Sequence, residues 1–176
     1  MKASLFLLLL FLIVSSCNTK KKEISRLVKE WSNKEILFPD QLEAHIFGRD
    51  TNCPDIWNAK YKILNYTDTS GCTECKMQLY GWKQLKQQTD SLQLDLSYVF
   101  IAWVEQYEEL ETLQQINKCD IPFFYDHTGQ MKQLNHFPEK EGFQTFLLDS
   151  ANRVVLIGNP VSNPDIRDLY IRALKQ

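Results

Sequence analysis

The sequence lacks a surplus of basic charge and any stretch dominated by glycine or proline. Its 176 residues carry 20 lysines and arginines against 22 aspartates and glutamates, for a net charge of −2. Nucleic-acid-binding domains usually show a strong basic surplus, so no nucleic-acid partner is expected. Glycine and proline occur six times each, and apolar residues make up 44% of the chain. This composition excludes collagen-like structure, wholesale disorder and a polytopic membrane protein, and it suits one globular domain.

Cysteine is also scarce, with five residues in the whole chain. This number is too small for a disulfide scaffold at this length, so the positions of the cysteines matter more than their count. Cys17, Cys72 and Cys75 each lie in an informative sequence context. Cys53 and Cys119 either pair with each other or remain as a loop thiol and a small buried residue, because sequence does not reveal connectivity.

The first sixteen residues are expected to form a signal peptide. A short positive start is followed by an uninterrupted apolar run from Leu5 to Val14. At ~1.5 Å per residue this run forms about 15 Å of helix, half of the ~30 Å core of a bilayer. The run therefore fits the apolar segment of a signal peptide better than a spanning helix.

The residues Val14-Ser15-Ser16-Cys17 resemble the lipobox of bacterial lipoproteins. That resemblance implies cleavage before Cys17, acylation of Cys17 and a polar tether over residues 17–22. Several acyl chains anchor a protein firmly, whereas a single chain gives marginal binding. We expect the body to lie in the periplasm, with the outer membrane favoured because Asn18 is not the aspartate that retains some lipoproteins in the inner membrane. The alternative is an ordinary secretory peptide cut near the same place.

The body divides at about residue 60. Residues 23–59 are expected to form an N-terminal extension, with a helix over 23–32, short strands at 36–38 and 45–48, and a loop over 49–58. Beyond it, strands are expected at 61–66, 96–104, 121–125, 145–148 and 153–157. Helices are expected after residue 72, around 107–116, at 131–137 and from Asn163 onward. Strands that alternate with helices predict an α/β fold with a central mixed sheet covered on both faces.

The segment Cys72-Thr73-Glu74-Cys75 lies between a predicted strand and a predicted helix. The free amides and the dipole at a helix N-terminus stabilise a thiolate there. Cys72 is then the expected nucleophile, and Cys75 the thiol that resolves a mixed disulfide with the substrate. The alternative is a static structural disulfide, because such bonds persist in oxidising compartments.

With the closing hairpin, this turn makes residues 60–176 similar to the thioredoxin superfamily, particularly the membrane-tethered TlpA-like thiol-disulfide oxidoreductases. The resemblance implies a three-layer thioredoxin-like domain over 60–176 that needs neither a cofactor nor a metal. It also implies an enzyme that reduces disulfides of periplasmic client proteins, with electrons from a membrane-embedded or periplasmic thiol donor. The residues implied to bind substrate are Gly71, Thr73, Glu74, Gln144 and Thr145.

Four positions qualify this resemblance. Gly71 replaces the bulky residue that usually precedes the first cysteine, and Tyr66 stands where the family often carries a buried acid. Gln144 occupies the place of a cis-proline, so a trans peptide is expected there, because a non-proline cis bond costs ~3 kcal/mol. Glu74 repels the Cys72 thiolate, which predicts a reducing dithiol.

Three other functions remain open from the sequence. A metal-binding protein would combine the two thiolates with His127 or His136, since soft thiolates and imidazole suit copper or zinc. A non-catalytic interaction module is also possible, because fold does not imply function. A peroxiredoxin would use one cysteine in a Pro-X-X-X-Thr/Ser-X-X-Cys setting, and this function ranks low because the chain lacks that setting.

Overall fold

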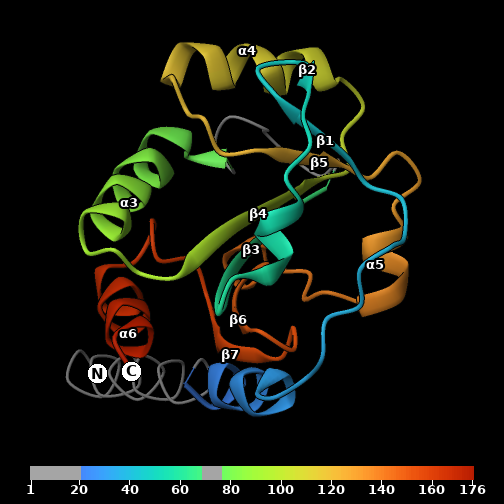
Figure 1. Cartoon of the computed structure of the whole chain (residues 1–176). Coiled ribbons are helices and arrows are strands. Elements are labelled where there is room, and N and C mark those ends of the chain that lie inside the picture. The colour runs from blue at the N-terminus through green and yellow to red at the C-terminus, as the bar shows by residue number, and fades with distance from the viewer. Residues whose placement is uncertain (1–20, 69–76) are drawn as a thin grey trace, which may run out of the picture.

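A mixed seven-stranded sheet runs through the computed structural model, which describes residues 21–68 and 77–176 (Figure 1). The strands lie in the order β2-β1-β5-β4-β3-β6-β7. Their bounds are β1 Glu43–Ile46, β2 Arg49–Asp50, β3 Tyr61–Thr67, β4 Leu96–Ala102, β5 Phe123–Tyr125, β6 Thr145–Asp149 and β7 Val154–Ile157. The helices are 21–31, η1 Pro54–Asn58, α3 Leu79–Ser91, α4 Tyr107–Asn117, α5 Gln130–Asn135, η2 Glu141–Phe143 and α6 Pro164–Leu174.

Strand β3 lies at the centre of the sheet. It pairs in parallel with β4 and antiparallel with β6, and all of its residues after Tyr61 are buried. Successive side chains of a strand point to opposite faces. Ile63 therefore joins one apolar core and Leu64 the other. A strand buried on both faces explains the continuous apolar character seen in the sequence.

The two cores place helices on both faces of the sheet. One core contains residues of α3, α4 and α6, among them Trp82, Leu110 and Tyr170. The other contains Trp31 from the helix over 21–31 and Met131 from α5, with η1 packed against it. The predicted α/β arrangement of a central mixed sheet between two helical layers is confirmed.

The segment expected to be an N-terminal extension contributes to the same sheet. Strand β1 pairs antiparallel with β5, and β2 pairs antiparallel with β1. The strand expected at 45–48 is therefore shifted to Glu43–Ile46, because Phe47 and Gly48 form the turn and both have positive φ angles. The loop expected over 49–58 contains β2 and η1.

The strand predicted at residues 36–38 is wrong. Residues 33–36 instead run beside residues 152–154, where β7 begins, with an isolated bridge between Glu35 and Arg153. Leu37 is bound by a side chain rather than a strand, because its N–H donates to Asn135 Oδ1 at 2.9 Å and its carbonyl accepts from Asn135 Nδ2 at 2.8 Å. A buried amide side chain thus takes the place of a neighbouring strand.

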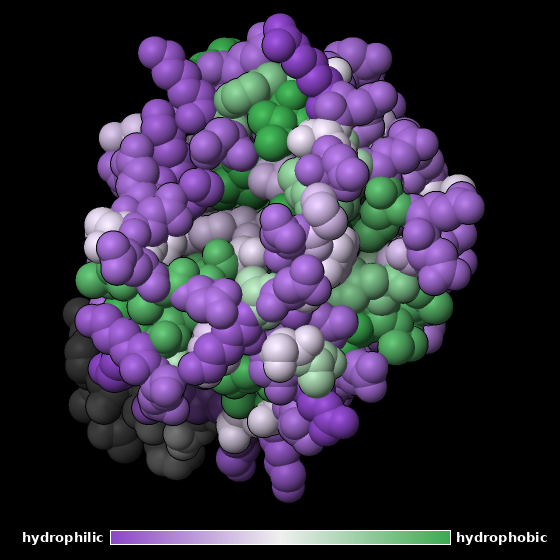
Figure 2. Space-filling view, in the orientation of Figure 1, coloured by the Kyte–Doolittle hydropathy of each residue, from purple (hydrophilic) through white to green (hydrophobic). Residues whose placement is uncertain are grey.

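No helix within residues 21–68 and 77–176 is long and apolar enough to cross a membrane. The face of the molecule seen in Figure 2 is mostly hydrophilic, with apolar patches between the charged side chains.

Candidate functional site

The predicted redox turn lies outside the described residues, and so does the predicted lipidation site Cys17. The turn contains Gly71, Cys72, Thr73, Glu74 and Cys75. The structure describes the two ends between which it falls. On one side, Thr67 is the last residue of β3 and is followed by Asp68. On the other side, Met77 lies just before α3.

The floor of the site is formed by paired residues of β3 and β6. Asn65 lies opposite Thr145, and the Thr145 hydroxyl donates a hydrogen bond of 2.8 Å to Asn65 Oδ1. Both side chains are buried. Thr145, predicted to bind substrate, is therefore brought to this position but is engaged within the sheet.

Gln144, also predicted to bind substrate, shapes the wall of the site. Its carbonyl accepts from the Tyr66 N–H at 3.0 Å, and its own N–H donates to the Glu141 carbonyl at 3.0 Å. Its side-chain amide donates to the Pro138 carbonyl at 2.9 Å. The described residues contain no cis peptide bond, so the trans peptide expected at Gln144 is confirmed.

A polar groove lies beside these residues, with a cavity volume of about 110 Å³. It is bounded by the end of β3, the start of α3, η2 and the connection between β7 and α6. The Ser162 hydroxyl donates to Gln78 Oε1 at 2.9 Å, which ties that connection to the start of α3. The lining residues are Asn65, Tyr66, Thr67, Gln78, Glu141, Gly142, Gln144, Asn159 and Ser162.

An ion pair between a buried carboxylate and a half-exposed lysine lies at the end of the central strand. Asp68 is 5% exposed, and its Oδ2 lies 3.0 Å from Lys132 Nζ of α5. The Tyr66 side chain is also buried, and its hydroxyl has no hydrogen-bond partner among the described residues. Burial raises the pKa of Tyr66, and the nearby carboxylates of Asp68 and Asp126 raise it further. Tyr66 therefore stays neutral, and the acids buried beside it are Asp68 and Asp126.

Sequence reasoning missed Asp68, although a signal was present. The acid directly follows a strand of apolar residues and precedes Cys72 by four positions. Its burial depends on α5, which comes more than sixty residues later and supplies Lys132. Because Lys132 neutralises the carboxylate, the charge is tolerated at a buried position.

The histidines considered for metal binding lie elsewhere. His127 is half exposed, with Nε2 3.2 Å from Glu43 Oε2, and His136 caps the C-terminal end of α5. Across 21–68 and 77–176, no group of three or more histidine, cysteine, aspartate or glutamate side chains is arranged to hold a metal ion. The two thiolates of the metal-binding alternative lie outside these ranges.

Cys53 and Cys119 are both free thiols, so they do not pair with each other. The Cys53 sulfur lies 3.7 Å from the Thr51 hydroxyl at the start of η1. Cys119 is fully buried in the core beneath α3 and α4, and desolvation raises the pKa of its thiol. The alternative of a loop thiol and a buried apolar residue is the one that the structure supports.

Comparison with known proteins identifies the fold. No protein-family model and no curated protein sequence matches the chain. A putative thiol:disulfide interchange protein DsbE from Chlorobium tepidum is 16% identical, with a TM-score of 0.58 over 81% of this chain and 99% of that one. The thioredoxin domain of a thiol-disulfide oxidoreductase from Bacteroides vulgatus is 12% identical, with a TM-score of 0.55 over 78% and 96%.

Peroxiredoxins match equally well. AhpC from Enterococcus faecalis is 17% identical, with a TM-score of 0.56 over 81% of this chain and 92% of that one. These likenesses confirm the predicted thioredoxin-like fold.

Proposed function

We propose that the protein is a thiol-disulfide oxidoreductase of the bacterial cell envelope. The observation that carries this proposal is the position of the Cys72-Thr73-Glu74-Cys75 sequence between the end of the central strand β3 and the start of α3. A Cys-X-X-Cys segment at a strand-to-helix junction of a thioredoxin-like sheet is the expected setting for a reactive dithiol.

The proposed reaction transfers two electrons to a client protein. The Cys72 thiolate attacks one sulfur of the client disulfide, and the other client sulfur leaves as a thiolate. The Cys75 thiolate then attacks Cys72 in the mixed disulfide and releases the second client sulfur. The client gains a dithiol and this protein gains a Cys72–Cys75 disulfide, which a membrane-embedded or periplasmic thiol donor must reduce.

The described residues support a role for the groove in holding the client. Its lining is rich in amides and hydroxyls, and it includes Thr67 and Gln78, which precede and follow the redox turn in the sequence. Gly71, Thr73, Glu74 and Gln144 are the proposed contacts. Membrane attachment through Cys17, in the periplasm and with the outer membrane favoured, belongs to the same proposal.

A second function, peroxide reduction, is favoured by the peroxiredoxins among the similar structures. In the peroxiredoxin motif Pro-X-X-X-Thr/Ser-X-X-Cys, a threonine or serine precedes the cysteine by three residues. Thr69 matches this position before Cys72, while Asn65 replaces the proline of the motif. In this reaction the Cys72 thiolate attacks the O–O bond of a hydroperoxide, giving a sulfenic acid and an alcohol. Cys75 then forms the disulfide and releases water.

A glutathione redox titration of the full chain tests the first function. Alkylation and mass spectrometry report the state of each thiol in the wild type, Cys72→Ser and Cys75→Ser, with Cys53→Ser as the matched control. We expect a reversible two-electron transition at a reducing potential, present in Cys53→Ser and lost in the other two. A pair that never opens or closes contradicts the proposal. Rapid consumption of a hydroperoxide that depends on Cys72, without reduction of protein disulfides, favours the second function.

A further inference from the structure

The helix over residues 21–31 concentrates positive charge on one side. Successive residues of an α-helix are 100° apart, so its basic residues fall within one broad stripe. They stand beside Ser25 on an exposed surface. The whole chain has a net charge of −2, so this stripe is opposite in sign to the molecule that carries it. The basic residues are Lys21, Lys22, Arg26 and Lys29.

Two apolar side chains lie exposed at the edge of the same stripe. Ile24 is 46% exposed and Val28 is 43% exposed, and their spacing of four residues places them on one line. The apolar residues of an ordinary surface helix face the core. Here Trp31 does so, stacked on Phe137 with ring centroids 6.0 Å apart, while Ile24 and Val28 remain in contact with solvent.

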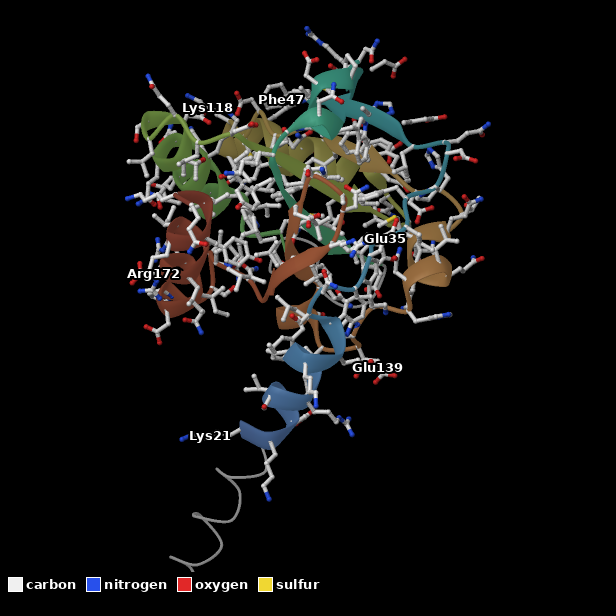
Figure 3. The ribbon with its side chains drawn as sticks, turned by 60° about the horizontal axis from the view of Figure 1, so that its bottom comes forward. Lys21, Glu35, Phe47, Lys118, Glu139 and Arg172 are labelled. Atoms are coloured by element: carbon white, nitrogen blue, oxygen red, sulfur yellow. The ribbon has the colours of Figure 1, made fainter. Side chains whose placement is uncertain are left out.

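One of the two acidic residues of this helix, Glu23, is engaged by a lysine from another part of the chain. The Glu23 carboxylate lies 2.5 Å from Lys140 Nζ, and this hydrogen bond and charge lower the pKa of Glu23. The ion pair also fixes the first turn of the helix to the segment before η2. Figure 3 shows the helix extending from the body, with Lys21 at its far end and Lys118 on the opposite side of the molecule.

We propose that this stripe binds the surface of an anionic membrane, with Ile24 and Val28 entering the headgroup region. A basic face bordered by exposed apolar residues is the pattern of helices that lie in a membrane interface. Clustered lysines and arginines near a membrane are each attracted to anionic lipids. The inference rests on the membrane attachment included in the proposed function, and it is independent of the redox chemistry.

The chain upstream places the helix within reach of a bilayer. The apolar run Leu5 to Val14 ends seven residues before Lys21. The six intervening residues span at most about 20 Å when fully extended. A chain held in the membrane by Cys17 or by this run thus keeps the basic stripe close to the lipid headgroups.

Amide hydrogen exchange of the full chain on vesicles tests the inference. The vesicles contain phosphatidylcholine alone or phosphatidylcholine with phosphatidylglycerol. We expect exchange within residues 21–31 to slow roughly tenfold only when phosphatidylglycerol is present. Added salt should reverse this protection, because salt screens exposed charges.

Two variants with equal charge changes provide the comparison. Lys21→Gln, Lys22→Gln, Arg26→Gln and Lys29→Gln together should abolish the protection. Arg49→Gln, Lys60→Gln, Lys118→Gln and Lys175→Gln together remove the same charge from exposed positions elsewhere and should leave it intact. Circular dichroism verifies that both variants fold.

The remaining outcomes overturn the inference in distinguishable ways. Flotation in a density gradient reports whether the chain is attached to the vesicles. If the chain floats with both kinds of vesicle and residues 21–31 exchange equally on each, the stripe does not bind anionic lipid, and membrane attachment stands. If the chain floats with neither, both the inference and the proposed attachment fail. Protection that appears instead on adding a soluble acidic protein, and not on vesicles, identifies a protein partner and rejects the membrane.

Discussion

The Asp68 carboxylate lies 3.0 Å from the Lys132 ammonium at the end of the central strand. Asp68 is buried, whereas the Lys132 side chain is half exposed. This pair joins β3 to α5 at the point where the chain enters the predicted redox turn. It therefore links the stability of α5 to the position proposed for the chemistry.

Replacing Lys132 should remove its ion pair with the buried Asp68 carboxylate. We expect Lys132→Met to lower the free energy of unfolding by about 1–3 kcal/mol, less than for a fully buried pair because Lys132 is partly solvated. Urea denaturation measures the change. In the double variant with Asp68→Asn, much of the loss should be recovered. Simple addition of the two single effects would show that the pair contributes no coupling.

Asp68 is also the buried acid that precedes Cys72 by only four positions in the sequence, and under the proposed function it is a candidate for proton exchange. We expect Asp68→Asn to slow resolution of the mixed disulfide by about tenfold or more, since a positioned acid or base contributes at least that much. The initial attack by Cys72 should change less. Stopped-flow mixing with a disulfide substrate separates the two steps across pH. The exposed Asp90→Asn is the control, and an unchanged pH profile in Asp68→Asn excludes the role.

Gln144 offers a test of the missing proline. Gln144→Pro removes the N–H that donates to the Glu141 carbonyl, and the observed φ of −96° lies outside the range of proline. We expect a loss of about 1–3 kcal/mol of stability in urea denaturation and no gain in activity. Gln144→Ala, which loses its bond to the Pro138 carbonyl, should cost about 1 kcal/mol.

A matched control for Gln144→Ala is Gln133→Ala. The Gln133 amide also donates to a carbonyl, that of Thr128, but it does so on the exposed surface. It should change stability by less than about 0.5 kcal/mol. Equal losses of stability at the two positions would mean that burial of the Gln144 hydrogen bond does not strengthen the fold.

Gln114 holds the β1–β2 hairpin to α4. The side chain is fully buried, its Oε1 accepts from the Phe47 N–H at 3.0 Å, and its Nε2 donates to the Ile121 carbonyl at 2.7 Å. Gln114→Ala leaves both backbone groups unpaired and opens a cavity, so we expect a loss of about 2–4 kcal/mol. The neighbouring exposed Gln115→Ala should be nearly neutral. Urea denaturation compares them, and similar values would contradict this account.

Cys119 should resist alkylation in the folded protein. Burial raises the pKa of its thiol above the ordinary 9.0, so at neutral pH it reacts far more slowly than the partly exposed Cys53. Burial of the neutral Cys119 thiol contributes fully to stability below pH 9. This contribution is lost as the pH rises through the higher pKa of the folded state, because the unfolded chain ionises first. Timed alkylation with and without urea measures the difference. Equal rates for Cys53 and Cys119 in the native protein would contradict it.

Local patterns in the sequence predicted much of the fold. The apolar runs of β3 and β4 identified the central strands because both are buried on two faces. Asn163 predicted the start of α6, and its side chain accepts from the Asp165 N–H at 2.9 Å. The pattern failed at residues 36–38, where the apolar residues suggested a strand and Asn135 supplied the hydrogen bonds instead.

The candidate site was less predictable because it depends on contacts between distant segments. Thr145 and Gln144 were identified from the hairpin, but their internal hydrogen bonds were not. The burial of Asp68 required α5, and the groove required the connection around Asn159 and Ser162. The spacing of apolar residues along the sequence predicts helices and strands, but it does not predict contacts between segments that lie far apart in the chain. The cysteines themselves were found because a short motif with a reactive chemistry is local in the sequence.

The backbone of residues 33–36 runs beside residues 152–154, which end at Val154, the first residue of β7. The Asn33 N–H donates to the Val154 carbonyl at 2.9 Å, and the Val154 N–H donates to the Lys34 carbonyl at 2.9 Å. At the other end of the sheet, β2 has two residues, both charged and exposed. An unprotected strand edge recruits strands from neighbouring copies and seeds aggregates. Because the start of one edge is covered and the other edge is short and charged, crowded copies of this protein should form fewer strand-to-strand aggregates than a fully open sheet would.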